Sequence, residues 1–225
     1  MWAGSNCDVA LCQGANFLSS KTPRSSGSGS GGSGAVSKSV RRLILLRHAH
    51  SSWANRSLKD HERPLSGRGR QQAASIAAKL RELGWLPELV LCSDSTRTRE
   101  TLEIIKRHTV ELLQVETHFL TTYYSVAAMD GHTAQHIRET ICKFAKDDIA
   151  TVLCMGHNRG WEEAASILCG RPLELKTSNA ALLEAHGCSW QETFASAGAG
   201  GWKLREILQP AAVAESSKLD IDLLT

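Results

Sequence analysis

The chain lacks any long apolar run. No stretch of its 225 residues approaches the roughly 20 consecutive apolar residues that a membrane-spanning helix needs, so we expect a soluble protein with no membrane partner. A large excess of one charge is also absent, since 26 Lys and Arg oppose 23 Asp and Glu. The balance lacks the excess of basic residues that is typical of nucleic-acid-binding domains, and we predict no nucleic-acid partner.

Paired cysteine motifs are missing as well. The seven cysteines include no CxxC pair, and their number is odd. Both observations argue against a disulfide framework. Free thiols in a reducing compartment are the simpler interpretation.

The first forty residues differ from the rest of the chain in composition, because they are poor in acids and contain a Ser- and Gly-rich stretch. Residues 25–34 are nearly all Ser and Gly, and the only acid before residue 41 is Asp8. Such a composition predicts a disordered extension over residues 1–40. Its hydroxyls and few positive charges are compatible with a transit peptide for a plastid or mitochondrion, and the alternative is an untargeted cytoplasmic protein. One domain over 41–210 and a tail over 211–225 complete the expected organisation.

From Arg41 onward, short apolar runs alternate with helical patterns. A helix is predicted after Ser66, which can cap it, and Gly84 ends it. Alternation of strands and helices predicts an α/β fold with a largely parallel sheet. The expected strands are 43–46, 89–92, 151–155, 181–183 and 202–208.

Two histidines directly follow predicted strands. Arg47 and His48 end the first strand, and His157 follows the third. Ligands bind beyond the carboxyl ends of parallel strands, so the two histidines are expected to share one pocket. A neutral His48 is a competent nucleophile toward phosphorus, a protonated His157 can donate to phosphate oxygens, and the guanidinium groups of Arg47 and Arg97 suit the same oxygens. The set suits phosphate chemistry without a metal.

Four segments carry a family resemblance. The chain resembles the histidine phosphatase superfamily, which is phosphoglycerate mutase-like, and within it the small SixA-like phosphohistidine phosphatase branch. The resemblance implies a three-layer α/β/α sandwich whose mostly parallel sheet contains one antiparallel strand. It implies no cofactor. The segments follow the family order across residues 41–210, and they are 45–53 (LLRHAHSSW), 60–69 (DHERPLSGRG), 93–101 (SDSTRTRET) and 156–158 (GHN).

The resemblance also assigns roles to individual residues. His48 is the expected phosphoryl-accepting nucleophile, and the phosphate pocket is expected to consist of Arg47, Arg97 and His157. Ser51 matches a position that binds substrate phosphate in relatives. A metal site at His48 and His50 is disfavoured, because metallohydrolase versions place an aspartate where Ser52 stands.

The general acid of larger family members has no evident counterpart. They present a glutamate after the third segment, whereas the nearest stretch here, 119–124, contains no carboxylate. A phosphoramidate nitrogen leaves more easily than an alcohol, so the missing acid favours phosphohistidine in proteins as the substrate. Asp60 is the candidate acid if its loop folds over the site. The alternatives are a phosphatase of small phosphomonoesters or phosphoramidates, and an inactive phosphate-binding module.

Three further residues near these motifs are expected to play structural parts. Arg99 is predicted to point away from the pocket, and Arg63 to hold its loop by salt bridges. Trp53 is predicted to pack in the core or at the pocket rim.

Overall fold

A computed structural model describes residues 39–129 and 131–212. The predicted extension, residues 1–40, and the predicted tail, residues 211–225, lie almost entirely outside this range, so both stay predictions. Among the described residues, no helix has the length and apolar character to span a bilayer.

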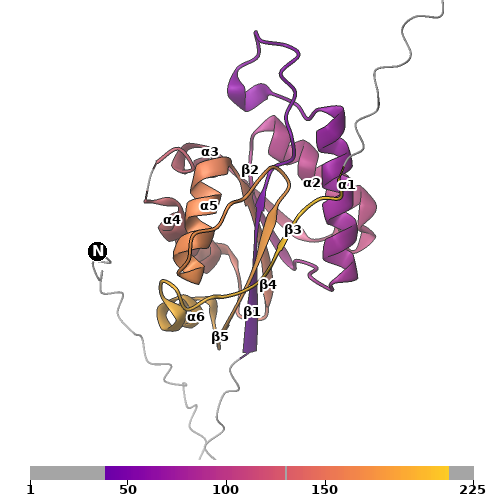
Figure 1. Cartoon of the computed structure of the whole chain (residues 1–225). Coiled ribbons are helices and arrows are strands. Elements are labelled where there is room, and N and C mark those ends of the chain that lie inside the picture. Colours follow the sequence, from indigo (N-terminus) through magenta and orange to yellow (C-terminus); the bar gives the residue numbers. More distant parts are fainter. Residues whose placement is uncertain (1–38, 130, 213–225) are drawn as a thin grey trace, which may run out of the picture. The chain divides into compact units, whose positions relative to one another are not determined.

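A six-stranded sheet runs through the described part of the chain (Figure 1). Its strand order is β3-β2-β4-β1-β5-β6, and β1, β2, β3 and β4 are parallel. β5 is antiparallel to both of its neighbours, which confirms the predicted sheet with one antiparallel strand. The strands are β1 (Ser39–Arg47), β2 (Leu89–Ser93), β3 (Glu116–Leu120), β4 (Thr151–Gly156), β5 (Ala180–Gly187) and β6 (Lys203–Leu208).

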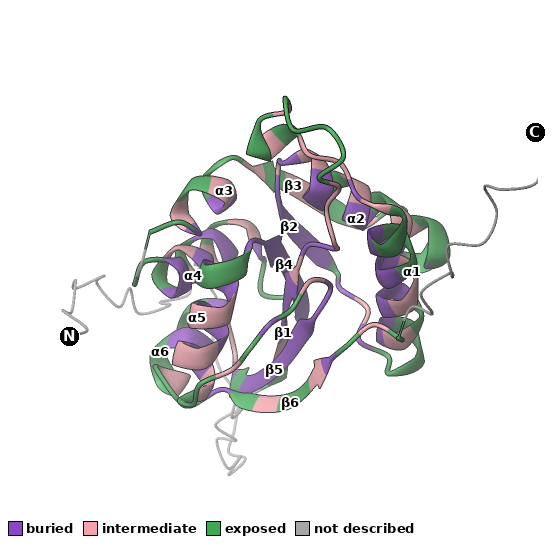
Figure 2. Ribbon diagram, turned by 45° about the horizontal axis from the view of Figure 1, so that its top comes forward, coloured by how far each residue is buried: buried purple, intermediate pink, exposed green. Residues whose placement is uncertain are grey.

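Helices cover both faces of this sheet, which makes the predicted three layers (Figure 2). One face packs against α1 (Gly67–Glu82), α2 (Thr96–His108) and the short η2 (Val110–Leu112). The other face packs against α3 (Thr122–Val126), α4 (Thr133–Phe144), α5 (Asn158–Cys169) and α6 (Trp190–Ala197). Burying strand residues on both faces explains why β1, β2 and β4 appear in the sequence as continuous apolar runs.

The alternation of side chains along β1 separates the two halves of the core. Leu43 and Leu45 pack with the α5 and α6 side, whereas Ile44 and Leu46 pack with the α1 and α2 side. All four are fully buried. Burial of one such side chain stabilises the fold by about 1.5–3 kcal/mol, so the two faces fix the register of β1 strongly.

Helix α1 forms as the sequence predicts. The Oγ of Ser66 accepts a hydrogen bond from the backbone N of Gly69 at 3.0 Å, which caps the first turn. The helix ends before Gly84, whose φ of +65° lies in the left-handed region that glycine tolerates. Its buried side chains include Ala73, Ile76 and Leu80, the predicted apolar face.

Strand β3 is the element that the sequence pattern does not indicate. It pairs only with β2 at the edge of the sheet, and none of its five residues is buried. An edge strand of this kind needs no apolar run, because only part of its surface faces the core. The segment therefore looks like a loop in the sequence.

Candidate active site

The pairing of β1 with β4 brings the two histidines together. Arg47 stands opposite Gly156 in the register, and the backbone N of His48 donates to the Gly156 carbonyl at 3.1 Å. The next residue after Gly156 is His157, so both imidazoles leave the same edge of the sheet. Their ring centroids are 5.2 Å apart, and each residue is only 7% exposed.

Arg97 joins the two rings from the first turn of α2. Its Nε donates to Nε2 of His48 at 3.2 Å, and its Nη2 lies 3.2 Å from Nδ1 of His157. A guanidinium only donates hydrogen bonds, so both of these ring nitrogens must be unprotonated acceptors. The protons then lie on Nδ1 of His48, which faces the Ala49 carbonyl at 2.8 Å, and on Nε2 of His157, which faces the Ser93 hydroxyl at 2.7 Å.

Both histidines are neutral in this arrangement. Burial lowers the pKa of His48 to about 3, with a further lowering by the positive charges of Arg97 and Arg47. Burial also lowers the pKa of His157 to about 2, and the neighbouring His48 and Arg97 act in the same direction. A neutral His48 agrees with the expected nucleophile. In the pocket without phosphate, the positive charges of Arg97 and Arg47 disfavour a protonated His157.

The loop between β1 and α1 folds over these residues. Its short helix η1 (Asp60–Glu62) places the Asp60 carboxylate 2.9 Å from Nη2 of Arg97, and the Asp60 carbonyl accepts from Nη1 at 2.5 Å. Burial raises the pKa of Asp60, but the hydrogen bond from Tyr124 and the charge of Arg97 outweigh it, so the pKa lies below its ordinary value. Asp60 is thus at the site, as expected of a candidate acid, but it is held there as a carboxylate.

Tyr124 is a site residue that sequence reasoning missed. Its hydroxyl donates to the Asp60 carboxylate at 2.9 Å, and its ring meets the His157 ring edge-on at a centroid distance of 5.0 Å. It also packs edge-on against His61, whose Nε2 lies 3.0 Å from Oδ1 of Asp94. The sequence gives no periodic signal for it, since Tyr124 belongs to the short helix α3 after the edge strand.

The Arg47 side chain is anchored by a hydrogen bond to the segment around Leu175. Its Nη1 donates to the Leu175 carbonyl at 2.7 Å, and the backbone N of Leu175 donates to the Glu162 carboxylate at 2.8 Å. Burial lowers the pKa of Arg47, while Glu162 raises it. The Nε of Arg47 is buried without a hydrogen-bond partner among the described residues, which leaves a donor for an anion.

Ser51 lies at the base of the loop. It forms an antiparallel bridge with Leu65 and makes none of the described contacts to the histidines. Its predicted role in substrate binding stays a prediction, as do the roles of the four pocket residues.

Gly156 matters for packing beneath the site. A Cβ at this position would lie 2.3 Å from the ring of Trp161, whose indole N donates to the Cys154 carbonyl at 3.0 Å. The absence of a side chain at Gly156 therefore allows the buried Trp161 of α5 to pack closely against β4.

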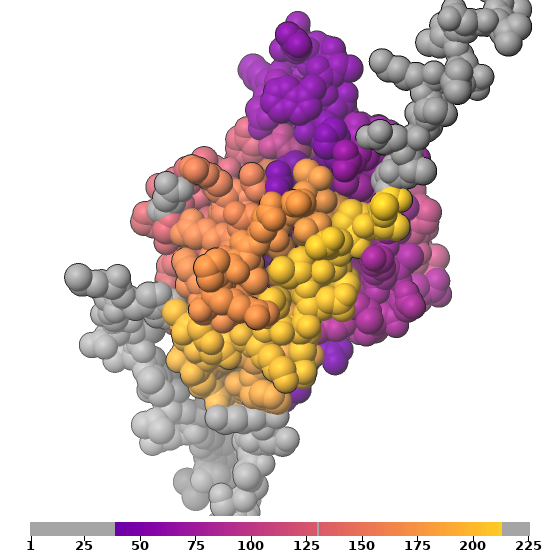
Figure 3. All heavy atoms as spheres, viewed as in Figure 1, coloured from indigo at the N-terminus to yellow at the C-terminus, as the bar shows by residue number. Residues whose placement is uncertain are grey.

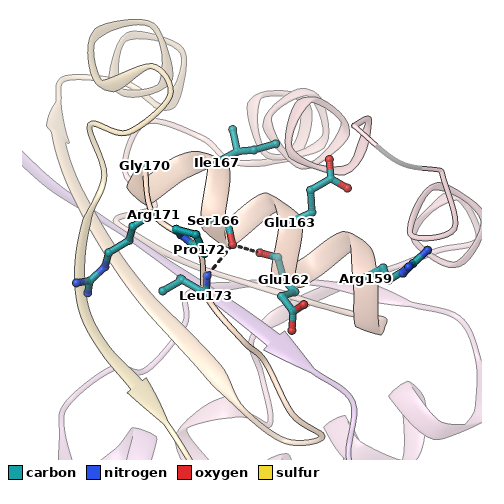
Figure 4. Close-up of a pocket in the computed structure, with 9 residues that line it drawn as sticks. All are labelled: Arg159, Glu162, Glu163, Ser166, Ile167, Gly170, Arg171, Pro172 and Leu173. Carbon is teal, nitrogen blue, oxygen red and sulfur yellow. Dashed lines mark hydrogen bonds between the residues drawn. The ribbon is translucent and has the colours of Figure 1, made fainter.

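One cavity among the described residues has neither His48 nor His157 in its lining. It measures about 600 Å³ and lies between α5 and the turn that follows it (Figure 4). Its walls include Glu162, Ser166 and Leu173, which hydrogen bonds tie together. The described residues contain no cluster of three or more His, Cys, Asp or Glu side chains suited to a metal.

Three residues close to the motifs were expected to play structural parts, and two of them do so as predicted. Arg99 points away from the pocket, as predicted, and its guanidinium lies 3.9 Å from the Phe119 ring centroid. Arg63 forms the predicted ion pair within its loop, 3.6 Å from Oδ1 of Asp60. Trp53 does not enter the core, because it is 63% exposed.

Comparison with known proteins identifies the family. The model of the histidine phosphatase superfamily, branch 1, matches residues 43–156. An uncharacterized chloroplastic protein of Arabidopsis thaliana is 56% identical over 170 residues, which cover 76% of this chain and 78% of the relative. The chain therefore belongs to the histidine phosphatase superfamily, which confirms the resemblance seen in its motifs and supports phosphatase activity.

Solved structures share the fold. The putative phosphohistidine phosphatase SixA of Nakamurella multipartitia is 25% identical, with a TM-score of 0.61 over 78% of this chain and 99% of its own. A mycobacterial glucosyl-3-phosphoglycerate phosphatase is 18% identical, with a TM-score of 0.51 over 77% of this chain and 100% of its own. The second likeness is one of fold alone.

Proposed function

We propose that this protein removes phosphate from phosphohistidine in proteins, through a covalent phosphoryl intermediate on His48. The observation that carries the proposal is the contact between Arg97 and His48. It requires an unprotonated Nε2 on His48, buried beside a guanidinium that can bind the phosphate oxygens. The nucleophile and the phosphate-binding group thus lie in hydrogen-bond contact.

The proposed reaction has two steps. The lone pair of Nε2 of His48 forms a bond to phosphorus while the phosphorus–nitrogen bond of the substrate breaks. The electron pair of that bond stays on the substrate imidazole, which takes up a proton. Water then attacks phosphorus and releases inorganic phosphate from His48. Arg97, Arg47 and a His157 that gains a proton beside the dianion neutralise the phosphoryl charge.

The state of Asp60 supports phosphohistidine over phosphoserine. An alcohol leaving group needs a protonated acid, whereas Tyr124 and Arg97 lower the pKa of Asp60. The imidazole of a phosphohistidine takes up its proton more readily than an alkoxide and so demands less of an acid in the enzyme. The likeness to a SixA structure points the same way.

The proposal is tested by phosphate release from a phosphohistidine peptide and from a matched phosphoserine peptide. We expect release from the first alone, with loss in a His48→Ala variant. Release from phosphoserine would instead assign Asp60 as a working acid. No release from either would refute the proposal and favour a small-molecule substrate or an inactive binding module.

A phosphatase of small phosphomonoesters or phosphoramidates is the second candidate. It would use the same four residues, and one protein with this fold is named a glucosyl-3-phosphoglycerate phosphatase. Turnover of a small phosphomonoester at a higher kcat/KM than the phosphohistidine peptide would favour it.

We also propose that the protein acts in a plastid. The support is the chloroplastic relative together with the composition of residues 1–40. Residues 1–40 fused to a fluorescent protein should direct it to chloroplasts in plant cells. Fluorescence in mitochondria or in the cytoplasm would contradict this.

A further inference from the structure

We infer that the loop between β1 and α1 is a docking surface for an acidic, extended polypeptide segment beside the phosphorylated residue of a protein substrate. This inference rests on the proposed function and names how the substrate is recognised. The loop stands out from the rest of the described chain at the end of the sheet that carries the histidines (Figure 3). Its exposed Trp53 is the central contact of the inferred surface.

Trp53 is held in place although it is exposed. The guanidinium of Arg63 lies 3.8 Å from its ring centroid, while the Arg63 side chain itself is only 12% exposed. The stacked guanidinium restrains the indole before any partner binds. Binding therefore costs little further side-chain entropy. A single exposed apolar residue needs no explanation, but a fixed Trp stacked on an Arg combines the two residue types that dominate binding hot spots.

The loop that carries Trp53 is fastened to the site. The backbone N of Ser52 donates to the Pro64 carbonyl at 2.8 Å, which closes the base of the loop. At its tip, Asp60 contacts Arg97 and His61 contacts Asp94. A partner bound on Trp53 therefore sits at a fixed position relative to the phosphate pocket.

A second pair of the same type lies next to Arg97. Arg99 is two residues further along α2, and its guanidinium covers the ring of Phe119, which is 41% exposed. The Nε of Arg99 donates to the Asp94 carbonyl at 2.9 Å. This second pair faces away from the phosphate pocket, so Trp53 on Arg63 remains the central contact of the inferred surface.

The charge of the loop selects an acidic partner. Arg56 and Lys59 of the loop, and Arg68 in the first turn of α1, are exposed, and no carboxylate among residues 39–129 and 131–212 forms an ion pair with them. The acids of the same loop are engaged locally. Asp60 binds Arg97, and the carboxylate of Glu62 accepts from the backbone N of Lys59 at 3.3 Å. Arg56, Lys59 and Arg68 outnumber the exposed Glu62, so the outward surface is positive overall, and acidic residues beside the phosphohistidine complement it.

The test compares two substrates in one set of variants. We expect Trp53→Ala and Arg56→Glu each to lower kcat/KM about tenfold on a phosphohistidine peptide with acidic flanks, the size of one moderate hot spot. Turnover of phosphoramidate, which has no flanking chain, should stay unchanged. Matched controls are Val110→Ala, at an equally exposed apolar residue, and Lys146→Glu, both at the opposite end of the sheet.

Several results would overturn the inference. They are equal losses on both substrates, no loss on the peptide, and equal turnover of peptides with acidic and with neutral flanks. If the wild-type protein hydrolyses neither substrate, the proposed phosphatase function fails. The affinity of the wild-type and Trp53→Ala proteins for the acidic peptide then tests the docking surface separately.

Discussion

The Nε of Arg97 donates to Nε2 of His48 across 3.2 Å, so the atom proposed to attack phosphorus is already in contact with a group proposed to bind the phosphate. The same guanidinium contacts His157 and Asp60. An arriving phosphate therefore competes with these partners for the N–H groups of Arg97.

Replacing Arg97 with lysine should lower kcat/KM by about 100-fold or more, because an ammonium group cannot contact both rings and the phosphate oxygens as a planar fork does. The rate of phosphate release from the phosphohistidine peptide measures this. Arg99→Lys is the matched control, since Arg99 lies in the same helical turn and faces Phe119. A similar loss in both variants would mean that the charge of this turn, and not the contacts of Arg97, matters.

The Asp60→Asn variant should bind inorganic phosphate severalfold more tightly. In the wild-type protein the Asp60 carboxylate occupies Nη2 of Arg97 and repels a dianion. The inhibition constant of phosphate or tungstate reports the change. Glu62→Gln removes the same charge two residues away and should have little effect. Weaker phosphate binding by the Asn variant would show that Asp60 assists the anion and does not compete with it.

Phosphate binding should be accompanied by proton uptake that grows as the pH falls below about 8. His157 is neutral in the empty pocket, since its pKa is lowered to about 2, and a dianion beside it raises that pKa. Titration calorimetry in buffers of different ionisation enthalpy counts the protons. His157→Asn should abolish the uptake, and unchanged uptake in that variant would place the proton elsewhere.

The stability of the folded protein should fall as the pH drops from about 6.5 toward 4. The pKa values of His48 and His157 are lowered to about 3 and about 2, so in this range the unfolded chain gains protons that the folded protein does not. Below pH 6.5 each histidine then contributes a slope of about 1.4 kcal/mol per pH unit, and the stability that is lost along this slope is fully present above pH 6.5.

The free energy of unfolding by urea, measured at several pH values, tests this slope. Other groups titrate in the same range, so the informative quantity is the difference between the wild-type protein and His157→Asn. The variant should lose less stability on acidification. Parallel curves would mean that His157 is protonated in the folded protein.

Replacing Gly156 with alanine should destabilise the protein by about 1–3 kcal/mol, because the new Cβ meets the buried Trp161 ring at 2.3 Å. Thermal or urea unfolding measures the loss. Gly67→Ala is the control, since a Cβ there has no atom within 4 Å. If both variants unfold alike, the packing of Trp161 against this glycine does not limit the substitution.

The sequence by itself determined the parts of the protein that depend on local pattern. Buried strands produce apolar runs, so β1, β2 and β4 could be predicted, and so could the histidines that follow two of them. The Ser66 cap fixed the start of α1. The motif order was enough to indicate the family and the antiparallel strand.

Only the tertiary structure decided the rest, because it depends on contacts between distant segments. Edge strand β3 carries no apolar run, and Tyr124 reaches Asp60 across 64 positions of sequence. The neutral state of His157 arises from burial and from Arg97, neither of which a local pattern records. Composition and periodicity describe neighbours along the chain, whereas a pKa is set by neighbours in space.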